Sequence, residues 1–156
     1  MEEGAKLTPQ LIEQAVRWVN DQRLNVAKLG EPLRPDWNHL ARRAGVVHLG
    51  QVRILAVDAM PQPTEQPLAG FIARSQIMEP GRIQGLTAGH SILIVKGYMS
   101  AWLVSHELRH VQQYEALGGV EAFIPRYLNE IAEFGYDNAP LERDARAYEF
   151  HEGPMS

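Results

Sequence analysis

The chain is predicted to fold as an α+β domain, because helical and strand-like segments are separated along the sequence and do not alternate. Helical patterns come first, strand-like stretches lie between Val46 and Val95, and helical patterns return from Ser100 onward. Such segregation favours an α+β fold over a doubly wound parallel sheet. The 156 residues suffice for one hydrophobic core, and no repeat or linker divides them. A single domain, 1–156, is therefore expected.

Two helices are expected before the first strand. Thr8 is a potential N-cap with Pro9 at the first helical position, and Leu11, Ala15 and Val19 follow at helical spacing. This pattern predicts an amphipathic helix over residues 9–23. A second, shorter helix is expected to begin after Pro35 and Asp36 and to run to Ala44.

The middle of the chain has the character of a short sheet. Residues 46–57 are rich in valine, isoleucine and leucine, and residues 61–67 contain three prolines, which defeat both helix and strand. A short strand is expected at 68–72, and a turn at 85–89. The apolar run 91–95 predicts the clearest strand in the chain.

Three helices are expected in the last part of the chain. Ser100 is a potential N-cap for a helix that ends at Gly118 and Gly119. The next stretch carries Phe123, Tyr127, Ile131 and Phe134 at steps of four, four and three. This helix is expected to have Pro125 in its first turn and to end at Gly135. A last helix is expected over residues 140–150. The fold class is thus N-terminal helices, a short antiparallel or mixed sheet, and C-terminal helices.

Composition excludes several kinds of function. The chain contains no cysteine, so disulfide scaffolds, thiolate zinc fingers and cysteine nucleophiles are excluded. Its net charge of −4 gives no general attraction to nucleic acid. The acidic start lacks a secretory signal pattern, and no apolar run is long enough to cross a bilayer. A cytoplasmic protein without nucleic-acid or membrane partners is expected, and signal-independent export remains an alternative.

The pattern His-Glu-x-x-His lies within the helix expected after Ser100. His106 and His110 are four positions apart, so both imidazoles lie on one helical face and can reach the same metal ion. Glu107 lies next to His106, about a hundred degrees around the helix. It can therefore contact a water molecule without being a ligand itself. The pattern indicates a zinc site with Glu107 as the catalytic base.

A catalytic zinc site built on two histidines needs a third protein ligand, which must be His, Asp or Glu. The candidates after the motif are Glu115, Glu121, Glu130, Glu133, Glu142, Asp144, Glu149 and His151. Glu115 is expected on the wrong face of the motif helix. The three glutamates of the connecting helix, at positions 121, 130 and 133, are expected in solvent.

Glu142 differs from the other candidates. It lies in the first turns of a helix introduced by the rigid Asn138-Ala139-Pro140 sequence, and Leu141 and Ala145 provide an apolar face beside it. We therefore expect Glu142 to be the third zinc ligand.

The second half of the chain resembles the gluzincin metallopeptidases, a group of zincins. The resemblance lies in the His106–His110 motif, then Gly135-Tyr136, then Ala139 to Ala145, and covers roughly residues 85–149. It is strongest to minimal single-domain members and related uncharacterised bacterial domains. In this group the third zinc ligand is a glutamate, often within Glu-x-x-Ala, which matches Glu142 and Ala145. The resemblance implies a small zincin-like fold.

The resemblance has further implications for the surroundings of the metal. Relatives that follow Glu-x-x-Ala with an acidic residue use it to orient a zinc-bound histidine, whereas this chain has Arg146 there; Asp144 or Glu149 could substitute. A tyrosine or histidine often stabilises the oxyanion in gluzincins, and Tyr136 is the first candidate, ahead of Arg146 and Tyr148. Strand 91–95 is a candidate to bind substrate through backbone pairing.

The sequence therefore predicts a zinc metallopeptidase that acts on a peptide or protein substrate. Two alternatives remain open: a non-catalytic or latent zinc-binding module that acts as a protein-interaction domain, and a helical partner protein with an accidental motif. The tryptophans at 18, 37 and 102 are expected in the core.

Overall fold

The computed structural model describes residues 7–79 and 81–151, and it confirms the α+β fold class. Its elements, in order, are helix α1 (Pro9–Leu29), strand β1 (Glu31–Pro32), helix α2 (Asn38–Ala44), strand β2 (Arg53–Val57), helix α3 (Leu68–Ser75), strands β3 (Gly85–Ala88) and β4 (Ser91–Val95), and helices α4 (Ala101–Leu117), α5 (Val120–Phe134) and α6 (Pro140–Ala147). Short 3-10 turns lie at Pro35–Trp37 and Leu49–Gln51.

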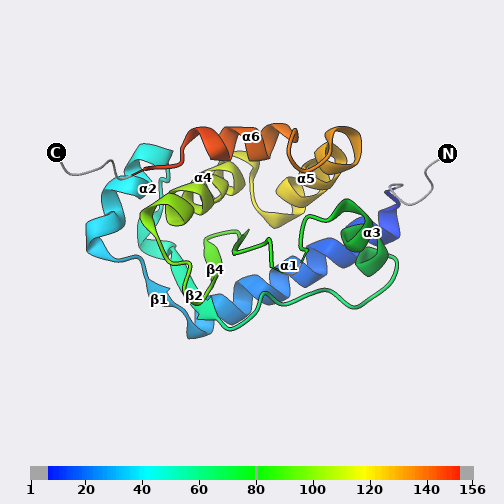
Figure 1. Cartoon of the computed structure of the whole chain (residues 1–156), viewed down its shortest axis with the longest axis horizontal. Helices are drawn as coiled ribbons and strands as arrows, with labels where there is room; N and C mark the ends of the chain where they lie inside the picture. The colour runs from blue at the N-terminus through cyan, green and yellow to red at the C-terminus, as the bar shows by residue number, and fades with distance from the viewer. Residues whose placement is uncertain (1–6, 80, 152–156) are drawn as a thin grey trace.

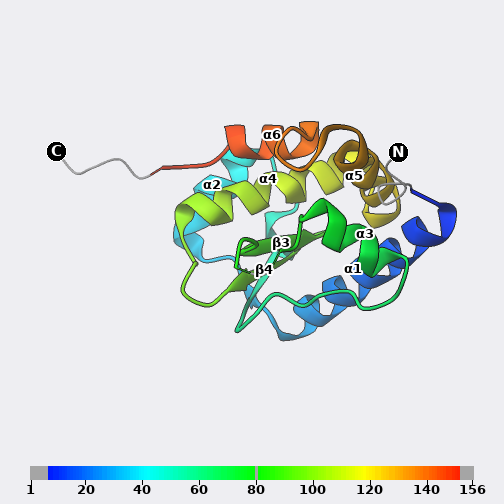
Figure 2. The ribbon, with the colours of Figure 1, turned by 45° about the vertical axis from the view of Figure 1, so that its right-hand side comes forward.

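The four strands form one mixed sheet in the order β1-β2-β4-β3. Strands β2 and β4 pair in parallel, whereas β1 with β2 and β3 with β4 pair antiparallel. The long helix α1 and the motif helix α4 lie on opposite sides of this sheet, and α6 lies beyond α4 (Figures 1 and 2).

The interior position of β4 explains its uniformly apolar sequence. Leu93 belongs to the core that the sheet shares with α1, α3 and α5, whereas Ile92 and Ile94 belong to the core shared with α2 and α4. Each face of β4 is therefore buried by a different layer of helices. A strand buried on both faces has a continuous apolar run instead of an alternating one.

Two expected elements differ in type from those of the structure. Residues 68–75 form helix α3 and not a strand, because Leu68, Phe71 and Ile72 are buried at helical spacing. Residues 85–88 form strand β3 and not a turn, and the reversal occurs at Gly89-His90.

Other expected elements differ in extent. Helix α1 continues six residues beyond position 23 to Leu29, because buried Val26 prolongs its apolar face. Within residues 46–57 only β2 is a strand. Pro125 lies inside helix α5 and beyond its first turn. Helix α6 ends at Ala147, before residues 148–150.

The tryptophans occupy different environments. Trp37 is buried and Trp18 is half-buried, as expected for core residues, but Trp102 is 43% exposed, so its expected place in the core is wrong. None of the helices in the described residues combines the length and apolar character that a bilayer span requires.

Candidate metal centre

Helix α4 is held firmly enough to present its motif in a fixed orientation. The Ser100 side chain accepts a hydrogen bond from the Leu103 N–H at 3.2 Å and caps the helix. Val104, Leu108 and Val111 are fully buried against the sheet side of the core. Because these three residues face the core, both motif histidines lie on the face of α4 toward α5 and α6. Each histidine is less than a tenth exposed.

The structure brings His106, His110 and Glu142 together. One ligand atom from each lies within 4.8 Å of the other two, and all three residues are buried. His106 Nε2 lies 3.1 Å from Glu142 Oε1, and His110 Nε2 lies 3.2 Å from Glu142 Oε2. The grouping expected from the sequence is therefore confirmed as a possible metal-binding cluster.

Glu142 reaches the cluster because helix α5 fixes the start of α6. Ala139 offers no capping side chain, and the Leu141 N–H instead donates to Glu130 Oε1 at 2.8 Å. Glu130 is 9% exposed, so its expected position in solvent is wrong. The Tyr127 hydroxyl, also from α5, donates to Glu142 Oε2 at 2.6 Å and fixes the carboxylate itself.

The far nitrogen of each imidazole is also held. His106 Nδ1 lies 2.9 Å from Glu149 Oε2, and His110 Nδ1 lies 2.8 Å from Gln113 Oε1. Partners of this kind orient a histidine ligand and select which nitrogen faces the metal. Of the two acidic residues expected to substitute at this place, where position 146 is an arginine, Glu149 is therefore the one that contacts His106. It can do so because α6 ends before it.

Gln113 and Arg146 complete the surroundings of the cluster. The Gln113 amide donates to Asp144 Oδ2 and to the Leu141 carbonyl oxygen, each at 2.9 Å, so Asp144 supports His110 indirectly. The Arg146 guanidinium donates to the backbone carbonyl of Asp137, away from both imidazoles.

The charges of the cluster favour an ionised glutamate. Burial opposes ionisation of Glu142, but the facing imidazoles of His110 and His106 outweigh it and hold the pKa of the carboxyl well below its ordinary value. Burial likewise disfavours a charged His110, yet the negative charge of Glu142 raises the pKa of that imidazole to about 9.

Glu107 lies beside the cluster and is not part of it. Its side chain is 4% exposed, and its Oε1 accepts a hydrogen bond of 2.6 Å from the Thr87 hydroxyl of β3. It lines the same cavity as the two histidines and Glu142. A Cβ atom at Gly85 would lie 2.7 Å from Glu107 Oε2, so another residue at this position would force the carboxylate to move.

Three tyrosines, Tyr114, Tyr127 and Tyr136, line the cavity. Tyr136 is half-buried there, and burial first, then the charges of Glu142 and Glu107, raise the pKa of its phenol. Sequence reasoning treated Tyr127 only as part of an apolar helix face, so its contact with Glu142 was missed. A hydroxyl-bearing residue on that face was the available signal. The third oxyanion candidate, Tyr148, instead lies beneath the Arg109 guanidinium, 3.9 Å from the ring centre, and is not among the lining residues described.

Substrate pairing with strand 91–95 is contradicted by the sheet. Strand β4 has β2 on one side and β3 on the other, so both of its edges are taken. The edge next to the cluster is β3. The Val95 N–H donates a hydrogen bond to the Gln84 carbonyl. Hydrogen-bonded and non-hydrogen-bonded pairs alternate along an antiparallel ladder, so the backbone N–H and C=O of Gly85 and Thr87 point away from β4. The Thr87 carbonyl already accepts a bond from the Tyr114 hydroxyl.

The remaining candidate ligands lie elsewhere. Glu115 is on another face of α4, as expected, and accepts hydrogen bonds from the backbone N–H groups of Val47 and His48. It also lies 2.8 Å from His90 Nε2. Glu121 and Glu133 are exposed.

The donor set suits a divalent cation. Two imidazole nitrogens and one carboxylate form the ligand set that catalytic zinc sites use, with room for one further ligand. Each imidazole has its Nδ1 held by a partner outside the cluster, so its Nε2, which faces Glu142, is the nitrogen directed at the metal position. Three carboxylates, those of Glu107, Glu142 and Glu149, surround two imidazoles, and a dication would offset two of the three negative charges that these groups carry when ionised.

No protein-family model, curated protein or solved structure matches the chain. The resemblance to gluzincins therefore rests on the motif residues and on their grouping in the fold.

Proposed function

We propose that the protein is a zinc-dependent hydrolase that cleaves peptide bonds, with His106, His110 and Glu142 as the metal ligands. One observation carries this proposal: the buried Glu107 carboxylate lies on the wall of the cavity that also exposes the His-His-Glu cluster. When bound, zinc would supply a Lewis acid that polarises a carbonyl group and lowers the pKa of water.

Glu107 is the proposed general base. Its carboxylate takes a proton from water as the water oxygen bonds to the peptide carbonyl carbon. When the carbon–nitrogen bond breaks, the same side chain returns that proton to the leaving nitrogen. Thr87 holds the carboxylate in place through its 2.6 Å hydrogen bond.

Two further groups have proposed roles in binding and stabilisation. The Tyr136 phenol lines the cavity and carries its proton at neutral pH, as an ordinary tyrosine does, so it is a suitable donor to a developing oxyanion. The outward N–H and C=O of Gly85 on the β3 edge are suitable for pairing with an extended peptide. Glycine there lets the substrate backbone approach close to Glu107.

The test compares the parent with Glu107→Gln on a mixed peptide pool, read by mass spectrometry, with zinc content measured on the same samples. The exposed Glu133→Gln is the matched control. We expect Glu107→Gln to keep its zinc and to lose hydrolysis by about 10²- to 10⁴-fold, the usual contribution of a general base. A zinc-loaded parent that cleaves nothing would instead support the non-catalytic zinc-binding module. Full activity in Glu107→Gln would exclude Glu107 as the base.

A further inference from the structure

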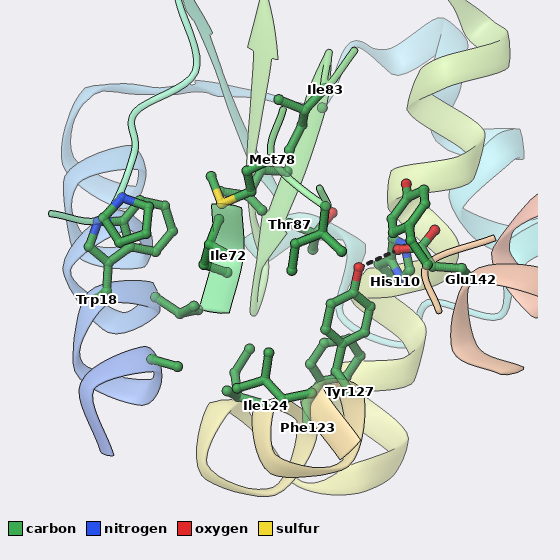
Figure 3. Close-up of a pocket in the computed structure, with 18 of the residues that line it drawn as sticks. Trp18, Ile72, Met78, Ile83, Thr87, His110, Phe123, Ile124, Tyr127 and Glu142 are labelled. Atoms are coloured by element: carbon green, nitrogen blue, oxygen red, sulfur yellow. Dashed lines mark hydrogen bonds and ion pairs between the residues drawn. The ribbon is translucent and has the colours of Figure 1, made fainter. Parts of the chain in front are cut away.

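The cavity beside the metal cluster has two ends of different character. His106, Glu107, His110 and Glu142 form one end. The other end is apolar and is lined mainly by Trp18, Val19, Ile72, Ile77, Met78 and Leu128. Figure 3 shows Trp18 and Ile72 across the open space from His110 and Glu142.

The size of the cavity suits one chemical group. It encloses about 90 Å³. A single water molecule needs about 10–15 Å³ in a protein cavity, so a group of several heavy atoms can enter. None of the lining residues described is lysine or arginine, and the acidic ones, Glu107 and Glu142, lie at the end with the two histidines. An apolar lining of this kind favours apolar groups, because a charged group would lose its hydration there without gaining a partner.

The apolar wall is preorganised by hydrogen bonds between α1 and α3. The buried Gln14 amide donates to the Gln66 carbonyl at 2.9 Å and accepts from the Leu68 N–H at 3.1 Å. These bonds hold the helix that carries Trp18 and Val19 against the one that carries Ile72. Of the six residues named for the apolar end, all but Leu128 thus lie before residue 85, outside the part of the chain that resembles gluzincins.

We propose that this cavity is a specificity pocket for one bulky apolar group, of the size of a leucine or phenylalanine side chain, next to the bond that is hydrolysed. The assignment of a substrate rests on the proposed function, whereas binding of the apolar group does not. Side chains of an extended peptide point alternately to two sides. A peptide beside β3 would therefore place one side chain in the pocket.

The first experiment measures binding without metal. Toluene is titrated into isotope-labelled, metal-free protein, and amide shifts of pocket residues are followed by NMR. Ala15→Leu fills the pocket, because Ala15 lines it from α1 and is 5% exposed. Ala27→Leu makes the same change at an exposed position of the same helix and is the control. We expect Ala15→Leu to weaken toluene binding at least about 10-fold, while Ala27→Leu binds like the parent.

A second variant keeps the inference testable if Ala15→Leu does not fold. Val19→Ala enlarges the pocket, because Val19 lines it. The variant should bind 1-methylnaphthalene, and we expect the parent not to bind it. No toluene-induced shifts at pocket residues in the parent, or equal affinity in Ala15→Leu, would overturn the pocket.

The second experiment uses the zinc-loaded parent on the peptide pool. In the parent, cleavage should concentrate beside leucine and phenylalanine. Ala15→Leu should shift cleavage toward alanine and valine, and its kcat/KM for peptides with the bulky residues should fall about 10- to 200-fold. Cleavage without this preference would overturn the substrate assignment. If the parent cleaves nothing while toluene still binds, the proposed function fails and the pocket stands as a binding site.

Discussion

At the scale of single residues, the position of Glu107 depends on two neighbours in β3. Thr87 donates a 2.6 Å hydrogen bond to the carboxylate, and Gly85 leaves the space that the carboxylate occupies. Neither residue belongs to the His-Glu-x-x-His motif. Their contribution follows from the packing of β3 against α4, which a helical motif alone does not reveal.

Loss of the Thr87 hydroxyl should destabilise the fold, because it leaves a buried carboxylate without that donor. A hydrogen bond to a charged group contributes about 1.5–3 kcal/mol, so Thr87→Val should lower the free energy of unfolding by that amount. Urea denaturation measures it. Thr64→Val, at an exposed loop position, is the control and should change stability by less than about 0.5 kcal/mol. Equal stability of the two variants would contradict a structural role for this hydrogen bond.

Glu115 should make stability depend on pH. Burial opposes its ionisation, but hydrogen bonds from the backbone N–H groups of Val47 and His48 outweigh burial and hold its pKa below the ordinary value of 4.5. A carboxyl with a lowered folded-state pKa stabilises the fold above its unfolded-state pKa, and this stabilisation is lost as pH falls through the folded-state value. Glu115→Gln should therefore be less stable than the parent at pH 7, and the difference should shrink below pH 4.5.

Denaturation at pH 7 and at pH 3 gives both differences for Glu115→Gln, with the exposed Glu13→Gln as control. A gap between parent and variant that does not change with pH would show that the carboxylate charge contributes nothing.

At the scale of elements, α6 depends on α5 for its position. Glu130 accepts the Leu141 N–H and so replaces the N-cap that α6 lacks. Glu130→Ala should lower the free energy of unfolding by about 0.5–2 kcal/mol, the usual effect of losing a cap. It should also speed hydrogen exchange in α6 and weaken zinc binding, because Glu142 is carried by that helix. Glu133→Ala, on the exposed side of α5, should do neither. Unchanged exchange in Glu130→Ala would contradict the capping role.

The helices with strong local signals could be predicted from the sequence. Thr8 caps α1 and Ser100 caps α4 through side-chain hydrogen bonds, as their sequence positions indicated. Short apolar segments could not be assigned reliably, because Leu68 to Ile72 fits either a strand or one helical turn. Strand β3 was missed because Gly85 suggested a turn. The structure gives another reason for this glycine, since a Cβ atom there would contact Glu107.

At the scale of the whole molecule, the site combines parts of very different predictability. His106, Glu107 and His110 come from one helix, so their arrangement follows from helical spacing alone. Glu142 required an argument about a second helix. Glu149 was one of two possible acidic partners for a histidine ligand, and Gln113 and Tyr127 were not assigned to the site. Their contacts depend on how α4, α5 and the segment after α6 pack together.

The cavity is likewise a property of the whole molecule. Its walls come from α1, α3, β3, α4, α5 and the residues around α6. Periodicity indicates which residues of these elements are apolar, but it does not show that their packing leaves space beside the metal cluster.

The central claim is that His106, His110 and Glu142 together hold one zinc ion, and an equilibrium zinc titration in competition with a colorimetric chelator tests it most directly. The parent should bind one zinc ion per chain, Glu142→Gln should bind it at least about 100-fold more weakly, and Glu133→Gln should match the parent. A parent that takes up no stoichiometric zinc, or a Glu142→Gln variant that binds zinc as tightly as the parent, would contradict the claim.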